Sequence, residues 1–483
     1  MAHHLLPACF DAECGPDLPD VALRCGISEA DVVRMLCDAA FTVGRLGFLP
    51  GFPYLDGVPS AMQLPRRSTP RPAVAAGSVA IANAQAGIYP TASPGGWHLL
   101  ARTSTTLFDP WRASPALLAA GDSVELRAVV RAEHEAAVAA RGAPPSIPRG
   151  ARTAQIVRAG PLTTVEDSGR HGFEHLGVAA GGASDLAAME LANALVGNAV
   201  DAAVLECALH GPTLRCDAPM LLAVTGAEVE LQIDNQPAQC HRAIAVPAGA
   251  EVRIGRCVRG ARAIVAIDGG IAVPLVLGSR STHRRSAFGG FLGRALAAGD
   301  EVPLHAATDR AARWAARHSV QRRALSRELL AAALVGAGPA LLRFRPGLAW
   351  EGLTDLVKLQ LSRDGHAASL AVASDRMGAR LDTPLVGTLP DETAGTHASA
   401  PVQRGTIQLP PDGRPIVLGA DHQATGGYPV LGQLIKADHS TLAQLRPGDA
   451  VRLLAIEAAA AARLDAVHAR HHAMALAALH LHG

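Results

Sequence analysis

The chain has 483 residues, 49% of them hydrophobic, and its 44 basic and 43 acidic residues give a formal net charge of +1. The length predicts roughly three domains, and the balanced charge argues against a nucleic-acid-binding protein, which carries a basic surface. The eight cysteines include no C-x-x-C pair and none follows Cys257, so we expect free thiols in a reducing compartment rather than a disulfide framework. Neither a signal-peptide pattern nor a long apolar span is visible, which predicts a soluble, cytoplasmic protein without membrane contact.

The first 130 residues predict two short helices followed by strands. Asp17 is expected to cap a helix that starts near Pro19, and Ser28 with Asp31 forms a capping-box pattern ahead of a second helix, which ends near residue 41. A loop rich in glycine and proline follows. From residue 74 to residue 130, short alternating runs between Gly and Pro turns predict β-strands.

A charged, alanine-rich segment that ends in prolines predicts a linker after these strands. Beyond it, strand and turn patterns dominate, and one helix is expected to begin at Ser184 and to stop at Gly197 and Asn198. The predicted division is a first β-module at 1–130, the linker at 131–152, a second module at 153–304, a helical or partly flexible bridge at 305–340, a third module at 341–456 and a C-terminal helix at 457–483.

One sequence pattern occurs three times and relates these modules to one another. Each copy begins V-x-x-G and closes with G-D-x-V, and the opening and closing glycines are 43 to 50 positions apart. The opening glycines are Gly77, Gly249 and Gly405, and the closing glycines are Gly121, Gly299 and Gly448. A repeat of this length with strand-rich ends predicts a folding module rather than a solenoid unit. Two related modules that face one another can build one site between them.

The candidate chemistry lies in glycine-rich turns that carry Asp, Arg and Tyr. The sequence contains no zinc-protease, serine-hydrolase, P-loop or dinucleotide-binding motif. Glycine lets backbone N–H groups converge on an anion, and Arg binds carboxylate or phosphate through a planar fork. Tight barrel turns fixed by Asp–Arg pairs are the alternative explanation. The candidate catalytic residues are Asp167, Arg170, Arg280, Asp421, Gln423 and Tyr428. The candidate substrate- or nucleotide-binding residues are Arg66, Arg71, Gln85, Tyr89, Ser93, Gly95, Gly96, Arg376, Gly426 and Gly427.

Three histidines near the C-terminus, His468, His471 and His472, have helical spacing. Imidazole groups at this spacing can bind a metal. An exposed terminal helix accounts for them better, so we predict no resident metal site there.

Two groups of longer motifs make the chain resemble a known family. GFLPGFPYL, PRRSTPR, GSVAIANAQAGIYPTASPGGWHLLART and LFDPWR resemble the C-terminal part of the B-type subunit of 5-oxoprolinase, which is also called allophanate hydrolase subunit 1 or KipI-like. LTTVEDSGRHGFEHLGV, LGSRST, FGGFLGRALAAGDEVPL, SDRMGARL and GADHQATGGYPVLGQLI resemble the C-type subunit of 5-oxoprolinase, which is also called allophanate hydrolase subunit 2, KipA-like or a biotin-dependent carboxyltransferase domain. The resemblance covers residues 5–130 and 153–454. It implies a fusion of the B-type and C-type subunits that is N-terminally shortened in its B part.

The resemblance implies a mainly-β fold with some α, built from cyclophilin-like β-barrels, one in the B-like part and two related ones in the C-like part. It also implies an ATP-dependent hydrolase that opens 5-oxo-L-proline to L-glutamate together with a separate LamB/YcsF-type protein, the A-type subunit of 5-oxoprolinase. ATP would be a co-substrate, accompanied by Mg²⁺, for which Asp167 or Asp421 could supply a ligand. No covalent biotin is expected, because the sequence has no A-M-K-M motif.

For the site, the resemblance implies a cleft between the two parts. We expect Arg280 and the loop from Asp421 to Tyr428 on one side, and Arg66, Tyr89 and the S-P-G-G-W loop on the other. The two sides can meet within one chain or in a homo-oligomer.

Two other functions remain open at this point. One is a carboxyltransferase module of the urea carboxylase or allophanate type, which would need a biotin carrier in trans. The other is a non-catalytic regulator that resembles the KipI–KipA pair. Binding assays with ATP and with biotin would separate the three.

Overall fold

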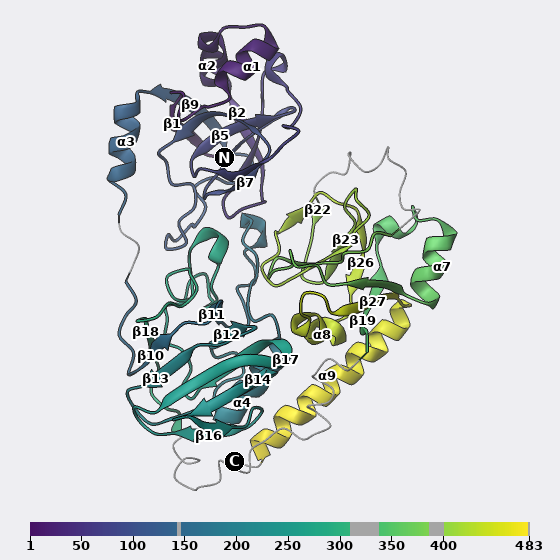
Figure 1. Cartoon of the computed structure of the whole chain (residues 1–483). Coiled ribbons are helices and arrows are strands. Elements are labelled where there is room, and N and C mark those ends of the chain that lie inside the picture. The colour runs from purple at the N-terminus through teal and green to yellow at the C-terminus, as the bar shows by residue number, and fades with distance from the viewer. Residues whose placement is uncertain (143–145, 310–337, 386–399, 482–483) are drawn as a thin grey trace. The chain divides into compact units, whose positions relative to one another are not determined.

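The computed structural model describes residues 1–142, 146–309, 338–385 and 400–481 (Figure 1). It divides into two compact units. Unit 1 comprises Met1–Pro145, His171–Ala179 and Gln423–Thr425, and unit 2 comprises Ser146–Arg170, Ala180–His422 and Gly426–Gly483. Most of the predicted bridge lies outside the described residues.

Unit 1 is built around a closed seven-stranded barrel. Its strands follow the order β1 (His3–Cys9), β8 (His98–Thr103), β5 (Ser78–Ala82), β6 (Gln85–Ile88), β3 (Pro53–Asp56), β2 (Phe41–Leu46) and β9 (Ser123–Val129). The parallel pairing of β1 with β9 closes the barrel. Buried aliphatic side chains such as Leu6, Ile81 and Leu100 fill it. Unit 1 also contains a separate short pair of strands, β4 (Arg71–Val74) and β7 (Ser93–Gly95).

The two helices predicted near the N-terminus are confirmed as α1 (Leu18–Cys25) and α2 (Glu29–Asp38). The capping box of α2 is also confirmed, because the Ser28 hydroxyl accepts the backbone N–H of Asp31 at 3.1 Å and the Asp31 carboxylate accepts that of Ser28 at 3.4 Å. Asp17 occupies the N-cap position of α1 as predicted, but its side chain makes no cap hydrogen bond. Its buried carboxylate instead accepts hydrogen bonds from Arg67 and from Arg71, the first residue of β4.

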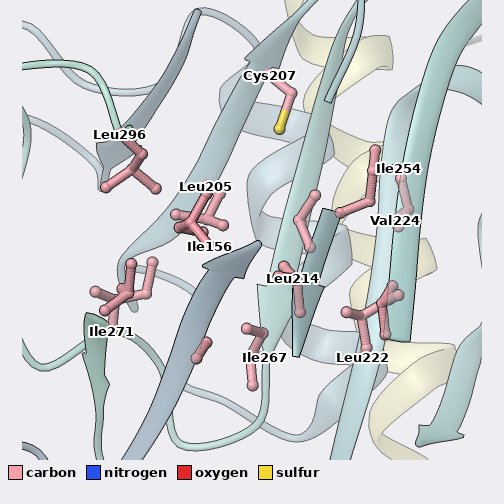
Figure 2. Close-up of a cluster of buried hydrophobic side chains, with 14 of the residues drawn as sticks. Ile156, Leu205, Cys207, Leu214, Leu222, Val224, Ile254, Ile267, Ile271 and Leu296 are labelled. Atoms are coloured by element: carbon pink, nitrogen blue, oxygen red, sulfur yellow. The ribbon is translucent and has the colours of Figure 1, made fainter. Parts of the chain in front are cut away.

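Unit 2 begins with a large, curled, nine-stranded sheet. One path through it runs β11 (Thr163–Glu166), β12 (Val204–Ala208), β17 (Glu251–Ile267), β13 (Thr213–Cys216), β10 (Arg152–Arg158) and β18 (Glu301–Leu304). The long strand β14 (Met220–Ile233) pairs with β17 and carries β15 (Gln236–Ala238) and β16 (Ala243–Val246). Figure 2 shows its apolar core, to which Leu205, Leu214 and Val224 contribute.

The helix α4 (Leu186–Val196) packs on β14 and β17 of this sheet. It ends at Gly197, which adopts the left-handed conformation as predicted. Its predicted cap is one residue off, because Asp185 accepts the backbone N–H of Ala188 and is the true N-cap. Ser184 instead binds the carboxylate of Glu206.

A second curled sheet of unit 2 has seven strands. Their order is β20 (His366–Ser369), β27 (Ala450–Ala455), β19 (Ala340–Pro346), β26 (Val430–Leu434), β23 (Thr406–Gln408), β24 (Ile416–Leu418) and β21 (Gly378–Arg380). The helices with it are α7 (Asp355–Arg363), α8 (His439–Gln444) and the predicted terminal helix α9 (Ala458–Leu481). Further elements of the described residues are the short strands β22 (Ala400–Pro401) and β25 (Thr425–Gly426) and the helix α3 (Arg131–Ala139), which lies in the predicted linker.

The threefold sequence repeat has one structural cause. All six of its glycines adopt positive φ, between +75° and +90°, a conformation that L-residues with a Cβ avoid. In each closing G-D-x-V, the Asp carboxylate accepts the backbone N–H three residues earlier: Asp122 from Ala119, Asp300 from Ala297 and Asp449 from Arg446. The same turn therefore closes three β-modules, and the mainly-β class with one barrel and two curled sheets is confirmed.

In the part of the chain that the structure describes, no helix combines the length and the apolar character needed to cross a membrane.

Candidate functional site

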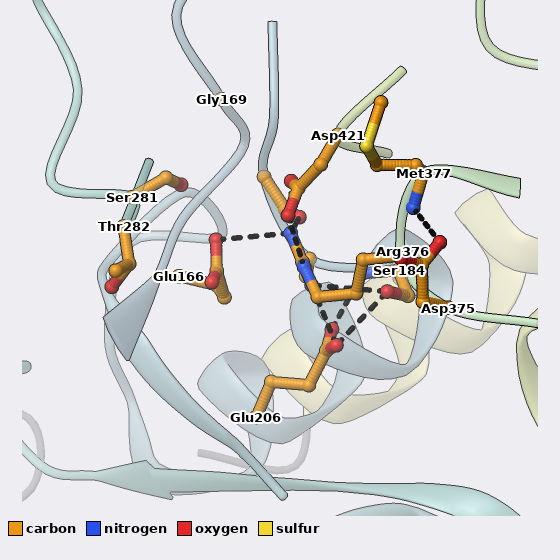
Figure 3. A network of polar contacts seen from close by, with 12 residues as sticks. Glu166, Gly169, Ser184, Glu206, Ser281, Thr282, Asp375, Arg376, Met377 and Asp421 are labelled. Carbon is orange, nitrogen blue, oxygen red and sulfur yellow. Dashed lines mark hydrogen bonds and ion pairs between the residues drawn. The ribbon is translucent and has the colours of Figure 1, made fainter. Parts of the chain in front are cut away.

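A buried polar network in unit 2 has Arg376 at its centre. Arg376 lies in the loop between β20 and β21, and its side chain is 5% exposed. It donates from Nε and Nη2 to the two oxygens of Asp421, each at 2.8 Å, and from Nη1 to Glu206 at 2.6 Å (Figure 3). Because Glu206 belongs to the nine-stranded sheet and Asp421 follows β24, one guanidinium group connects the two sheets of unit 2. A planar fork with five donors suits this task, which Lys could not perform.

The same guanidinium group also fixes a glycine-rich loop. Its Nη2 donates to the carbonyl of Gly182 at 2.7 Å, and its Nη1 donates to the Ser184 hydroxyl at 3.0 Å. A second arginine, Arg404, donates to the next carbonyl, that of Ala183, at 3.0 Å. The segment from 182 to 184 is therefore held by two cations, the buried Arg376 and the half-buried Arg404.

Strand register brings two acidic side chains to this network. Val165 and Leu205 point into the apolar core of the nine-stranded sheet, and side chains alternate along a strand. Glu166 and Glu206, each the next residue, therefore point to the opposite face, where Arg376 lies. Both glutamates are almost completely buried.

The pKa values of these two glutamates are shifted in opposite directions. Burial alone would raise the pKa of Glu206, but the guanidinium groups of Arg376 and Arg262 lower it to about 2. Burial raises the pKa of Glu166 well above its usual value, and the Arg376 charge only partly opposes this effect. The geometry agrees, because Glu166 lies 3.4 Å from Nη2 of Arg376 and neither of its oxygens has a hydrogen-bond partner among the described residues. Arg376 therefore stabilises the ionised form of Glu206 more strongly than that of Glu166, whose pKa stays raised.

Asp167, which directly follows Glu166, holds the loop that carries Arg280 in place. Its Oδ1 accepts the backbone N–H of Gly169 at 2.8 Å and the hydroxyls of Ser279 and Ser281, each at 2.6 Å. Its Oδ2 accepts the backbone N–H of Arg280 at 2.5 Å. A carboxylate with four donors is held in a single position, and so is the loop that supplies the donors.

The guanidinium group of Arg280 is anchored at one end only. Its Nε donates to the carbonyl of Val273 at 2.9 Å. No acceptor for its two terminal nitrogens occurs among the described residues, and the residue is partly exposed. Arg280 therefore presents a positioned, planar pair of donors, the arrangement that binds carboxylate or phosphate oxygens.

Arg170 is buried more deeply, with 1% of its surface exposed. Its Nη2 donates to the carbonyl of Ser281, and its guanidinium carbon lies 5.1 Å from the ring centroid of Phe288. Its Nε and Nη1 have no hydrogen-bond partner in the described part of the chain. The structure thus brings five predicted residues into one neighbourhood of unit 2, namely Asp167, Arg170, Arg280, Arg376 and Asp421.

The predicted residues of the first module lie in unit 1. Tyr89 is 2% exposed and packs edge to face on Phe52, and burial raises the pKa of its hydroxyl to about 12. A Cβ on Gly95 would lie 2.3 Å from that hydroxyl, so the glycine is needed for the tyrosine to fit. Arg71 donates two hydrogen bonds to Asp17, at 2.9 and 2.6 Å, whereas Arg66 is exposed.

The remaining predicted residues occupy more ordinary positions. Gln85 donates to Asp56 at 3.3 Å, the Ser93 hydroxyl donates to a neighbouring carbonyl, and Gly96 is half-buried. Gln423 belongs to unit 1 and is half-buried. In unit 2, a Cβ on Gly426 would lie 2.1 Å from Gln408, and Gly427 and Tyr428 are exposed.

The expected Mg²⁺ does not fit the two carboxylates that were candidates for it. Every oxygen of Asp167 and Asp421 already accepts at least one hydrogen bond, and those of Asp421 face the cation of Arg376. Within the described ranges, no group of three or more His, Cys, Asp or Glu side chains is arranged to hold a metal ion.

Sequence reasoning missed the acidic partners Glu166 and Glu206 and the second arginine Arg404. A signal for Glu206 was present, because a charged residue inside the apolar strand VLECA is rarely buried without a partner. Glu166 directly precedes Asp167 in the predicted motif TTVEDSGRHG, but its burial depends on strand pairing that the sequence does not reveal.

Two family models match the chain. The model described as "Carboxyltransferase domain, subdomain A and B" matches residues 176–455, and "Carboxyltransferase domain, subdomain C and D" matches residues 1–118.

Similar proteins include two different subunits of 5-oxoprolinase. The 5-oxoprolinase C subunit of Escherichia coli (strain K12) is 33% identical over 316 residues, which cover 64% of this chain and 94% of the relative. The 5-oxoprolinase B subunit of Escherichia coli O157:H7 is 50% identical over 119 residues, which cover 25% of this chain and 55% of the relative, so the chain spans about half of that relative. Urea amidolyase of Lachancea kluyveri is 36% identical over 152 residues, which are 31% of this chain and 8% of the relative.

Two solved structures show the fold. The crystal structure of TTHA0988 superposes with a TM-score of 0.74 at 31% identity and covers 94% of this chain and 86% of its own. The Kluyveromyces lactis urea amidolyase gives a TM-score of 0.59 at 20% identity, with coverage of 90% and 25%, and so bears on the fold alone. The predicted resemblance to the B-type and C-type subunits and the predicted cyclophilin-like β-barrel modules are confirmed.

Proposed function

This chain belongs to the carboxyltransferase-domain family, and we propose that it is a component of an ATP-dependent 5-oxoprolinase. The proposed reaction converts 5-oxo-L-proline, ATP and water to L-glutamate, ADP and phosphate, and the proposed partner is the LamB/YcsF-type protein that forms the A-type subunit. The observation that carries the proposal is the match to two different subunits of that enzyme within one chain. The similarity to the C-type subunit extends over 94% of that relative.

The chemistry of the substrate explains what such a site must provide. A five-membered lactam is a poor electrophile, and transfer of a phosphoryl group to its amide oxygen would make its carbonyl carbon reactive toward water. Both the substrate carboxylate and the ATP phosphates are anions that must be held in a fixed geometry. Positioning and electrostatic stabilisation supply most of the rate in phosphoryl transfer.

We assign the binding of one of these anions to Arg280. Its guanidinium group is anchored through Nε on Val273 and through its backbone N–H on Asp167, while its terminal nitrogens have no partner among the described residues. Asp167 then acts as a positioning residue, because all its contacts serve to hold the loops of Ser279–Ser281 and Gly169. The pair of Arg376 and Asp421 fixes the two neighbouring loops that carry these residues in the same way.

A second candidate function is carboxyl transfer to or from biotin. It is favoured by the family description of both matching models and by the similarity to urea amidolyase. The sequence contains no biotin-carrier motif A-M-K-M, so this function would require a biotinylated partner.

Product analysis separates the two functions. The purified chain is mixed with the A-type subunit, and the mixture is incubated with ATP and isotopically labelled 5-oxoproline, and separately with carboxylated biotin and urea. Labelled glutamate that forms only when ATP and both proteins are present supports the proposal. Carboxyl transfer between biotin and urea without glutamate formation would replace it with the second function.

A further inference from the structure

The polar network places a donor without an acceptor, on Arg170, and the partly exposed carboxylate of Asp421 near one glycine, Gly181. Nη1 of Arg170 has no acceptor among the described residues, although buried N–H groups almost always have a partner. A Cβ on Gly181 would stand 3.5 Å from this Nη1 and 3.8 Å from Oδ1 of Asp421. Both distances are ordinary van der Waals contacts, so the lack of a side chain at Gly181 leaves open the position that borders both a donor and an acceptor.

This place is rigid, and its outer edge at Gly181 and Asp421 is partly exposed. Arg170 donates its backbone N–H to Ala180 at 2.7 Å, and Arg376 binds Gly182, so the residues on both sides of Gly181 are tied down. Gly181 and Asp421 are partly exposed, whereas Arg170 is buried. A ligand would therefore enter at the edge of the network beside Gly181 and supply the acceptor that Arg170 lacks.

The balance of charge favours a neutral ligand group. Asp167 and Asp421 both lie close enough to attract the Arg170 charge. An additional anion would meet these acids, whereas a neutral carbonyl oxygen would not. A fixed donor beside a fixed acceptor matches an amide whose C=O and N–H point to the same side, which is the arrangement in a lactam or in urea.

The geometry points to Arg170, Gly181 and Asp421 as a subsite for such a cis-amide edge, with the carbonyl oxygen on Nη1 of Arg170 and the N–H on Oδ1 of Asp421. The inference rests on the proposed function and deepens it, because it separates recognition of the amide from binding of anions by Arg280. Gly181 is the specificity-determining residue, since any side chain there would occupy the place of the ligand.

Binding of small neutral probes tests the subsite without turnover. We would measure binding of 2-pyrrolidinone, N-methyl-2-pyrrolidinone and urea to the full chain by saturation-transfer NMR, with 5-oxoproline as competitor. We expect 2-pyrrolidinone to bind and the N-methyl compound, which lacks the N–H, to bind roughly 10- to 100-fold more weakly, as loss of a hydrogen bond to a charged group predicts.

The matched variants are Gly181→Ala and Gly249→Ala. Both glycines have positive φ, +66° and +75°, and nothing lies within 4 Å of a Cβ at Gly249. The two variants therefore share the backbone strain, but only Gly181→Ala should abolish lactam binding. Equal binding of both pyrrolidinones, or full binding by Gly181→Ala, would overturn the subsite.

Failure of the subsite and failure of the proposed function give different results. Lactam binding that requires Gly181, in a chain that never forms glutamate, would retain the subsite and remove the oxoprolinase proposal. Urea that binds more tightly than the lactam would retain the cis-amide subsite and identify the urea-type substrate. Glutamate formation that is unaffected by Gly181→Ala would retain the proposed function and remove the subsite.

Discussion

Replacement of Arg376 by Met tests whether the buried network holds unit 2 together. The substitution keeps an unbranched side chain but removes the donors that now reach Asp421, Glu206, Ser184 and Gly182. Glu206 would keep only Arg262, at 3.3 Å, as a cationic partner. Removing one member of a buried ion pair costs about 3–5 kcal/mol, because the remaining charge stays buried.

The lowered pKa of Glu206 gives a similar value for the loss of folding free energy. Burial would raise it, but Arg376 first and then Arg262 lower it from 4.5 to about 2, and each pKa unit corresponds to about 1.4 kcal/mol. The depressed pKa means that this stabilisation, about 3 kcal/mol, is complete above pH 4.5. It is lost as the pH falls toward 2, so the penalty of the Met variant should be largest at neutral pH.

The assay is urea unfolding at pH 7, followed by circular dichroism. The matched control is Arg256→Met, which removes an exposed ion pair with Glu230, at 3.5 Å and with the arginine side chain 67% exposed. Such surface pairs contribute less than about 1 kcal/mol. The reasoning is refuted if Arg376→Met lowers the free energy of unfolding no more than the control does.

Three further outcomes are expected. Glu166→Gln should become progressively more stable than the natural chain as the pH rises above 4.5, by about 1.4 kcal/mol per pH unit until the folded pKa is reached. The reason is that burial raises the pKa of Glu166, so its ionisation favours the unfolded chain. If the unfolding free energies of the two proteins change with pH in parallel, this prediction is contradicted. In unit 1, Gly121→Ala should lower the free energy of unfolding by about 1–2 kcal/mol, because the φ of Gly121 is +89°. Gly77→Ala should lower it by roughly 1–3 kcal/mol more, because its Cβ would also lie 2.3 Å from the Thr103 carbonyl oxygen. Thermal unfolding compares the two variants, and equal losses of stability would show that the close contact is relieved. Arg280→Ala should reduce kcat/KM for 5-oxoproline-dependent ATP hydrolysis roughly 10- to 100-fold with an unchanged circular dichroism spectrum, and full activity would remove Arg280 from the site.

The sequence predicted local structure well where the signal was local. The capping box at Ser28, the stop of α4 at Gly197 and the turns of the threefold repeat depend on residues within a few positions of each other. Turn chemistry of this kind requires particular residues whatever the rest of the chain does.

Predictions failed where a residue far away in the sequence forms the hydrogen bonds that a local cap would have used. Asp17 would cap α1 in isolation, but Arg71, 54 residues away, takes its carboxylate. Ser184 likewise gives up the capping position to bind Glu206, 22 residues away. The network around Arg376 depends on contacts between residues that are 45 and 170 positions apart in the sequence. No local sequence pattern predicts such pairs. The glycine-rich loops with Asp and Arg nevertheless indicated which segments form the network.

The measurement that tests the central claim most directly is phosphate release from ATP by the purified chain, with and without 5-oxoproline and with and without the A-type subunit. The account predicts phosphate release that matches the glutamate formed and that requires both 5-oxoproline and the A-type subunit. A folded chain that releases no phosphate under these conditions, or releases it equally without 5-oxoproline, would contradict it.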